Sequence, residues 1–274
     1  MESITVIVPF RHGSQPDTSK FPPGTVFQDD EGMGKKYALK TAVAAATTEF
    51  VWLTDDDVTD AASVIANTDI SLIPDTDMLI LPLRMTAGGG SILERLQQIE
   101  YAAIQTLTLL SAMNNSPVLC SGANLIVRCE RWLESQEDLH MDLPSGDDMF
   151  LLESFKRRGL RIASGHMCMT ISPIAGLRQL LRQRMRWAGK APHYKDKDIR
   201  LAGAVVVLLN LFSVLFPPLW LLKLLIEASI ISYGRQHYAF LMPKRSPLLV
   251  ILLSLLYPWY MLISLIGGLL RKGW

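Results

Sequence analysis

The chain has 274 residues, of which 49% are hydrophobic and 19% are charged, and its mean hydropathy is +0.23. It is too apolar for an ordinary soluble domain and too highly charged for a chain that lies wholly in a membrane, so a mixed protein is expected. The net charge of +1 hides an uneven distribution: −10 over residues 1–175, +6 over 176–200 and +5 over 201–274. This pattern argues against a nucleic-acid binder with a broad basic face and against a disordered chain.

The first 175 residues predict strands that alternate with helices. Apolar and β-branched runs predict strands at 4–8, 49–54, 78–83 and 125–128, and helices are predicted at 35–46 and 91–112. The segment 12–33 is rich in Pro, Gly and Asp and is predicted to be a loop. Alternating strands and helices indicate an α/β domain with a mostly parallel sheet.

Three consecutive carboxylates, Asp55, Asp56 and Asp57, directly follow the predicted strand at 49–54. They repel one another, so solvent or a cation must surround them. In an extended stretch alternate side chains share a face, which predicts that Asp55 and Asp57 lie together and that Asp56 points away. Two oxygen ligands on one side suit Mg²⁺ or Mn²⁺. A solvated acidic turn is the alternative.

A second acidic pair, Asp147 and Asp148, follows Gly146 where an amphipathic helix is predicted to begin. Capping and the helix dipole account for one of these carboxylates. The second is a candidate general base, because a like charge beside a carboxyl group tends to raise its pKa.

A basic segment over 176–200 contains a helix predicted from about 174 to 188, with arginines on the face opposite an apolar stripe. The stripe consists of Leu177, Leu180, Leu181 and Met185. This helix either lies on anionic lipid, or its Arg186 neutralises a diphosphate while Trp187 stacks on a sugar ring. The two interpretations do not exclude each other.

Two long apolar runs follow, at 201–233 and 247–270. A membrane span needs about 20 apolar residues, so the second run predicts one transmembrane helix. The first run is long for one span and short for two. It predicts either a kinked, tilted helix or a hairpin that turns at Pro217 and Pro218.

In chain order these features resemble the membrane-bound family 2 glycosyltransferases of the GT-A fold, which include cellulose and hyaluronan synthases and smaller cell-envelope enzymes. The matching stretches are Val6–Arg11, Gly34–Leu39, Thr54–Asp57, Ser121–Asn124, Gly146–Asp148 and Gln183–Trp187. The resemblance implies a GT-A catalytic domain over 1–175, an interface helix carrying a QxxRW motif over 176–200, and two or three transmembrane helices over 201–274.

The resemblance also implies roles for individual residues. The donor diphosphate is expected to contact Lys35, Asp55, Gln183 and Arg186. A Mg²⁺ or Mn²⁺ ion is expected on Asp55 and Asp57, and the catalytic carboxylates are expected to be Asp148, as the base, and Asp147. The acceptor is expected to contact Gly122, Asn124 and Trp187.

The implied reaction moves a sugar, with inversion, from a nucleotide-diphosphate donor to a hydroxyl group of a lipid-linked or glycan acceptor. The implied location is the cytoplasmic face of a bacterial membrane, with membrane lipid as a further partner and no nucleic acid.

The chain departs from the family pattern between its first strand and Gly34. The family has a helix there and a second strand that ends in acidic residues, whereas only 12–33 remain here. Either the nucleotide-binding part is abbreviated, or 4–8 is that second strand and Phe10–Ser14 replace its acidic end. A catalytically impaired transferase-like membrane protein is therefore one alternative.

A haloacid-dehalogenase-like phosphatase is a further alternative, with its nucleophile motif at Asp55-x-Asp57-x-Thr59. That interpretation requires a hydrophobic strand before Asp147, but 136–145 is polar. It also leaves Gln183–Trp187 unexplained.

Overall fold

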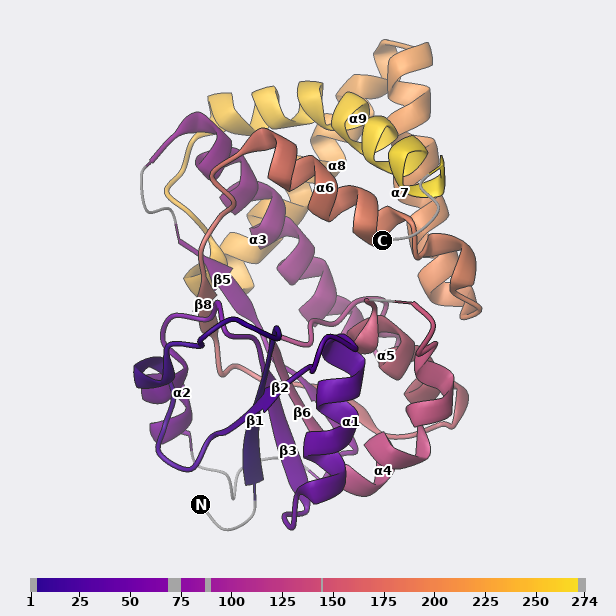
Figure 1. The fold of residues 1–274 in the computed structure, drawn as a ribbon. Coiled ribbons are helices and arrows are strands. Elements are labelled where there is room, and N and C mark those ends of the chain that lie inside the picture. The colour runs from indigo at the N-terminus through magenta and orange to yellow at the C-terminus, as the bar shows by residue number, and fades with distance from the viewer. Residues whose placement is uncertain (1–3, 69–74, 87–89, 144, 271–274) are drawn as a thin grey trace. The chain divides into compact units, whose positions relative to one another are not determined.

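The computed structural model describes residues 4–68, 75–86, 90–143 and 145–270 (Figure 1). The chain divides into two compact units, one made of 1–83 and 109–171 and the other of 84–108 and 172–274. The segment 84–108 thus clusters with the C-terminal part of the chain, although it lies within the predicted catalytic domain 1–175.

The first unit is built on a six-stranded sheet with the strand order β2-β1-β3-β6-β4-β7. Its strands are β1 (Ile4–Phe10), β2 (Val26–Asp29), β3 (Phe50–Thr54), β4 (Met78–Ile80), β6 (Asn124–Arg128) and β7 (Ile162–Ser164). Strand β1 is parallel to β2 and β3, and β4 is parallel to β7, whereas β6 runs antiparallel between β3 and β4. The predicted α/β fold with a mostly parallel sheet is confirmed.

Strand β2 corrects the prediction that 12–33 is a loop. Its four residues pair with β1 in the register Ile7 to Val26 through Phe10 to Asp29. The strand lies at one end of the sheet order, and none of its residues is buried. An edge strand of this kind is held by its backbone hydrogen bonds, so its sequence need not show a buried apolar face.

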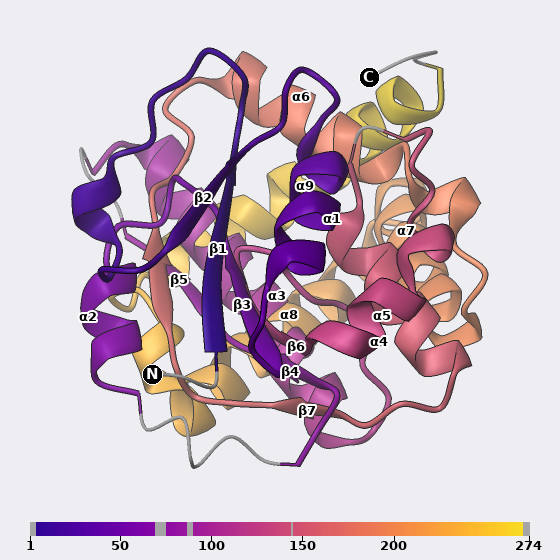
Figure 2. The ribbon, with the colours of Figure 1, turned by 60° about the horizontal axis from the view of Figure 1, so that its bottom comes forward.

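Helices pack on this sheet and on one another. They are α1 (Lys35–Ala45), α2 (Ala61–Ala66), α4 (Cys129–Glu134) and α5 (Asp147–Arg157), with the 3₁₀ turns η1 (Thr18–Lys20) and η3 (Gln136–Leu139) and the short strand β8 (Met169–Ile171). Helix α1 packs against β1, β2 and α4 (Figure 2). It buries a stripe of small and apolar side chains, Ala38, Leu39, Ala42 and Val43, as an amphipathic helix does.

The second unit is largely helical. Its helices are α6 (Leu177–Ala188), α7 (Lys197–Leu215), α8 (Pro218–His237) and α9 (Pro247–Leu270), with the 3₁₀ turns η4 (Ala191–His193) and η5 (Ala239–Leu241). Helix α3 (Ile92–Met113) and strand β5 (Leu83–Met85) each have residues in both units. Helix α9 packs against α6, α7 and α8 (Figure 1).

The apolar run 201–233 is divided between two helices. Helix α7 ends at Leu215, and α8 begins at Pro218, where a proline suits the first turn of a helix. The break falls at the two prolines, so a single continuous helix over this run, kinked or not, is excluded.

Among the described residues, two helices, α7 and α9, are long and apolar enough to cross a membrane. Only 17% of the most apolar window of each helix is buried. Their apolar side chains therefore face outward, whereas a core helix of a soluble domain would bury them.

Helix α8 carries a charged group inside the helical unit. Lys223 is fully buried, and its Nζ donates to Glu227 Oε1 at 2.6 Å. The same ammonium donates to the backbone oxygen of Ser254 at 2.9 Å and to its Oγ at 3.1 Å. These contacts join α8 to α9 and satisfy the buried charge.

Candidate active site

Lys35 links two of the acidic motifs in the first unit. Its Nζ lies 2.6 Å from Asp55 Oδ1 and 3.1 Å from Asp147 Oδ2. Burial disfavours the charge of Lys35, but the Asp147 and Asp55 carboxylates outweigh that effect and hold the pKa of Lys35 above its ordinary value. The lysine is therefore a fixed positive charge between two carboxylates.

Each partner comes from the end of a different element. Lys35 is the first residue of α1, Asp55 directly follows β3, and Asp147 is the first residue of α5. The residues before both helices, Gly34 and Gly146, have φ of 92°, a conformation that glycine adopts far more easily than other residues. The two glycines let the chain turn sharply into α1 and α5 and so position Lys35 and Asp147.

Gly122 makes room for this ion-pair cluster. A Cβ atom at this position would lie 2.9 Å from Asp147 Oδ2 and 3.2 Å from Lys35 Nζ. The first distance is shorter than real Cβ contacts, so any larger residue would displace the carboxylate. The structure thus brings together four of the predicted site residues: Lys35, Asp55, Gly122 and Asp147.

The three consecutive carboxylates lie in a turn and not in an extended strand. Strand β3 ends at Thr54, and the amide of Val58 donates to the backbone oxygen of Asp55 at 3.3 Å. The prediction that Asp55 and Asp57 share a face of an extended strand was therefore wrong, because the strand, and with it the alternation of side chains between two faces, ends at Thr54.

Asp57 is exposed, yet its carboxyl group is crowded. Partial desolvation in the turn, together with the negative charges of Asp55 and Asp56, raises the pKa of Asp57 to about 6. The same two causes, desolvation and the charge of Asp55, raise the pKa of Asp56. A cation beside this turn would relieve the repulsion.

The donor set fits a divalent ion that is completed by other ligands. Within the described residues, no group of three or more His, Cys, Asp or Glu side chains is arranged to hold a metal unaided. Asp55 and Asp57 offer hard carboxylate oxygens, and Mg²⁺ or Mn²⁺ commonly binds through one or two carboxylates plus water and substrate phosphate. These two residues therefore fit such an ion when a phosphate-bearing substrate is present.

Asp147 and Asp148 have different surroundings. Asp147 is buried and paired with Lys35, whereas Asp148 is half-buried and its Oδ1 accepts from the amide of Met149 at 2.7 Å. A carboxylate held by a lysine is a poor proton acceptor, since the positive charge stabilises its ionised form. Of the two, Asp148 is better suited to accept a proton.

Asn124 has a structural role in the first unit, and its predicted contact with an acceptor stays a prediction. It is fully buried, and its Oδ1 accepts from Trp52 Nε1 at 2.9 Å. Its Nδ2 donates to the backbone oxygens of Pro82 and Met167, both at 2.8 Å. Both amide hydrogens and the oxygen are therefore engaged inside the first unit.

The ends of β1 and β2 form a polar turn that the sequence did not predict. His12 Nδ1 lies 3.0 Å from Asp29 Oδ2, and the amide of His12 donates to Asp30 Oδ1 at 2.9 Å. The amide of Glu31 and the neighbouring His12 keep the pKa of Asp29 below its ordinary value. The second strand therefore ends in two ionisable carboxylates next to the end of the first.

The predicted diphosphate-binding and acceptor residues of the basic segment all lie on α6, in the second unit. Arg186 is exposed, and Gln183 and Trp187 are half-buried. Gln183 Oε1 accepts from Arg184 Nη1 at 3.0 Å, and the guanidinium of Arg184 stacks 4.1 Å from the Trp187 ring centroid. Arg184 thus contacts two of the three predicted residues.

The burial of Arg184 corrects the predicted polar face of this helix. Arg184 is only 6% exposed, and its Nη2 donates to Glu100 Oε2 on α3 at 2.8 Å. Burial opposes the charge, but the Glu100 carboxylate outweighs it, so the pKa of Arg184 is raised. Conversely Leu177, predicted in the apolar stripe, is 55% exposed, because the buried part of α6 begins at Leu180.

Comparison with known proteins agrees with the fold. The family described as glycosyltransferase-like family 2 matches residues 20–190. The chain belongs to this family. It has the GT-A fold and is a glycosyltransferase.

Among solved structures, the chain is similar to the mannosyltransferase PcManGT from Pyrobaculum calidifontis, in complex with GDP-Man and Mn²⁺. The TM-score is 0.54 and the identity 17%, over 98% of this chain and 87% of that chain. Glucosyl-3-phosphoglycerate synthase from Mycobacterium tuberculosis gives a TM-score of 0.43 and 18% identity, over 68% of this chain and 78% of that chain. No curated protein matches the chain.

Proposed function

We propose that this glycosyltransferase moves a sugar, with inversion, from a nucleotide-diphosphate donor to a hydroxyl group of a lipid-linked or glycan acceptor. The observation that carries the proposal is the cluster of Lys35, Asp55 and Asp147 around Gly122, next to a less constrained Asp148. Four motifs that are distant in the sequence meet there. The cluster combines a fixed cation, a turn suited to a divalent ion and a carboxylate suited to accept a proton.

In the proposed reaction Asp148 accepts the proton of the acceptor hydroxyl. The hydroxyl oxygen forms a bond to the anomeric carbon, while the bond from that carbon to the diphosphate oxygen breaks. The nucleoside diphosphate leaves with the bonding electrons, and in-line attack inverts the anomeric centre. General-base catalysis and positioning of the two reactants together supply the rate enhancement.

Charge on the departing diphosphate requires positive partners. A divalent ion on Asp55 and Asp57, when bound, would neutralise part of that charge. Lys35 supplies a permanent charge beside Asp55, and we assign Gln183 and Arg186 to the diphosphate from the QxxRW motif. Trp187 is assigned to the acceptor, and its contact with Arg184 restricts its orientation.

The nucleotide-binding part is less abbreviated than the sequence predicted. Strand β2 is present, and Asp29 and Asp30 stand at its end beside β1. We propose that these two carboxylates contact the nucleoside of the donor. Their presence supports an active enzyme over a catalytically impaired relative.

We propose that α7, α8 and α9 anchor the chain in a membrane, with the first unit on the cytoplasmic side. The outward-facing apolar side chains of α7 and α9 support this location. The connection between α8 and α9 carries Lys244 and Arg245, and basic residues favour the cytoplasmic side of a membrane. The bacterial origin predicted from the motifs stays a prediction.

The phosphatase alternative is disfavoured by the surroundings of the second acidic pair. Asp147 and Asp148 form the first turn of α5, and the 3₁₀ turn η3 is the element before that helix. The hydrophobic strand that such a phosphatase requires there is replaced by η3 and a turn.

A donor screen tests the proposed function. The purified full chain, reconstituted in lipid nanodiscs, would be incubated with UDP-, GDP- and dTDP-sugars, lipid extract as acceptor, and Mn²⁺, Mg²⁺ or excess EDTA. We expect at least one donor to give both nucleoside diphosphate and labelled glycan or glycolipid with a metal present, and loss of both products in EDTA.

Two variants that each remove one carboxylate charge sharpen the screen. Asp57→Asn should remove the response to metal, whereas Asp142→Asn, at an exposed position outside the predicted site residues, should leave it unchanged. Turnover in EDTA equal to that with metal would rule out the metal requirement. Donor binding without any product would favour the impaired relative, and release of phosphate from monoesters would favour the phosphatase.

A further inference from the structure

The connection between α8 and α9 is strongly basic. Lys244 and Arg245 lie in it, Arg235 precedes it in the last turn of α8, and the sequence has no acidic residue after Glu227. Arg245 lies close enough to Arg235 for the two positive charges to repel each other. After Glu227 the sequence supplies no carboxylate to neutralise this pair.

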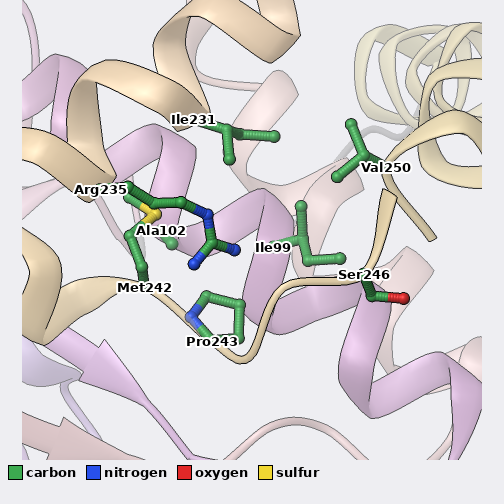
Figure 3. A pocket seen from close by; sticks show the side chains of 8 residues that line it. All are labelled: Ile99, Ala102, Ile231, Arg235, Met242, Pro243, Ser246 and Val250. Atoms are coloured by element: carbon green, nitrogen blue, oxygen red, sulfur yellow. The ribbon is translucent and has the colours of Figure 1, made fainter. Parts of the chain in front are cut away.

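Arg235 lies at a small cavity within the second unit (Figure 3). The lining residues are Ile99, Ala102, Ile231, Arg235, Met242, Pro243, Ser246 and Val250. They come from α3, α8, the connection and α9, and all but Arg235 and Ser246 are apolar. The empty volume is about 220 Å³, and this figure includes space open to solvent.

The guanidinium of Arg235 extends among these apolar side chains (Figure 3). Within the part of the chain that the structure describes, neither a carboxylate nor a carbonyl group forms a hydrogen bond or ion pair with it. A guanidinium presents a planar set of donors that matches phosphate oxygens in pairs. The cavity therefore combines an available phosphate-binding group with an apolar wall.

Tight packing fixes the wall of this cavity. A Cβ atom on Gly234, the residue before Arg235, would lie 2.2 Å from Met242 Cε and 2.5 Å from Thr106 Oγ1. The end of α8 thus approaches both α3 and the connection as closely as a glycine permits. Arg235 projects from this packed junction and not from a loose loop.

We propose that this cavity binds the phosphate of an anionic phospholipid, with Arg235 as the phosphate ligand. The apolar lining would contact the glycerol and the upper part of an acyl chain. Lys244 and Arg245 add a general attraction to an anionic surface, whereas Arg235 makes the specific contact. The proposal does not depend on sugar transfer, and it gives the second unit a defined lipid site.

Binding of short-chain lipids to the full chain in detergent tests the proposal. The probes are dioctanoyl phosphatidylglycerol, dioctanoyl phosphatidylcholine and inorganic phosphate, with bound lipid counted by native mass spectrometry. We expect phosphatidylglycerol to bind at least about 10-fold more tightly than either other probe. The choline cation of phosphatidylcholine is repelled by the positive charges of Arg235, Lys244 and Arg245, and inorganic phosphate has no apolar part to contact the wall of the cavity.

Two variants that each remove one positive charge separate the site from the general surface charge. Arg235→Gln should weaken phosphatidylglycerol binding by about 10-fold or more. Lys244→Gln, outside the cavity lining, should weaken it by no more than about 5-fold, as expected for one surface charge. Equal losses in the two variants would overturn the proposal, and so would equal binding of phosphatidylcholine to the unmodified chain.

Arg235→Lys keeps the charge and the apolar stem, so it serves where Arg235→Gln does not fold. It should lose part of the preference for phosphatidylglycerol, because an ammonium group cannot match two phosphate oxygens at once. An unchanged preference in a folded Arg235→Lys chain would refute the guanidinium contact. Inorganic phosphate bound as tightly as phosphatidylglycerol would refute the role of the apolar wall.

Discussion

Replacing Asp148 with asparagine separates proton transfer from structure. The substitution keeps the size of the side chain and an oxygen that can accept from the Met149 amide, but it removes the proton acceptor. A positioned general base contributes about 10²–10⁴ to the rate, so kcat should fall by that factor, or about 3–5 kcal/mol in the barrier. The free energy of unfolding should change by less than about 0.5 kcal/mol, as at most positions without a buried ion pair.

Asp147→Asn is the matched comparison one residue earlier. Its carboxylate pairs with Lys35 at 3.1 Å, and the side chain is only 10% exposed. Losing that charge leaves Lys35 with its ion pair to Asp55 and the nearby charge of Asp148. We expect a loss of about 1–3 kcal/mol in the free energy of unfolding, the usual cost when a hydrogen bond to a charged group is lost from a partly buried site.

Three measurements distinguish the two variants. Nucleoside diphosphate release at saturating donor gives kcat, calorimetric titration gives donor affinity, and thermal unfolding in detergent gives stability. For Asp148→Asn we expect a large loss of kcat with donor affinity and stability preserved. For Asp147→Asn we expect a lower unfolding temperature.

Our reasoning would be refuted if Asp148→Asn kept more than about a tenth of the wild-type kcat. It would also be refuted if Asp147→Asn lost all activity at unchanged stability, because Asp147 would then be the base despite its pairing with Lys35.

Gly122→Ala should lower the free energy of unfolding by about 1–3 kcal/mol and also lower transfer activity, because the new methyl group displaces the neighbouring carboxylate. The control is Gly203→Ala, at a position with open space around it. Equal unfolding temperatures of the two variants would contradict the packing argument. Glu100→Gln should lower the free energy of unfolding by about 3–5 kcal/mol, since it leaves the buried charge of Arg184 without the Glu100 carboxylate. Glu134→Gln, in the exposed pair with Arg131, should lower the free energy of unfolding by less than about 1 kcal/mol. A similar loss in both variants would show that burial of the Glu100–Arg184 pair contributes little to stability.

The sequence was most informative where local pattern alone determines structure. The Ala-rich composition of 35–46 predicted α1 to within one residue, and the β-branched run at 4–8 predicted β1. The direction of β6 was not predictable, because a strand's own residues do not reveal whether its neighbours run parallel or antiparallel. That depends on the connections, here the long helix α3 and the turn before Asn124.

Long-range contacts account for the errors at individual residues. Arg184 was placed on a polar face because its partner Glu100 is 84 positions away in the sequence. Asn124 was assigned to an acceptor because Ser121–Asn124 resembles a family motif, and its burial was not predicted, because its three side-chain hydrogen bonds all reach residues more than 40 positions away. In both cases the hydrogen-bond partners of the buried side chain are too far away in the sequence for a local pattern to reveal them.

The sequence predicted which acidic motifs belong to the site, but it did not predict how their side chains are arranged. Carboxylates after a strand and before a helix were recognisable in the sequence. That Lys35 joins Asp55 to Asp147 follows only from the packing of α1 and α5 against the sheet. The ion-pair cluster is therefore a tertiary feature.

The buried ammonium of Lys223 has a consequence for the stability of α8. Its three hydrogen-bond acceptors are Glu227, four residues later, and two atoms of Ser254, 31 residues later. In the proposed membrane location, Lys223 has Glu227 as its one partner until α9 packs against α8, and a lysine facing hydrocarbon with one partner is costly. If the chain is anchored as proposed, we expect α8 to be stable in the bilayer only together with α9, whose Ser254 supplies two of the three acceptors.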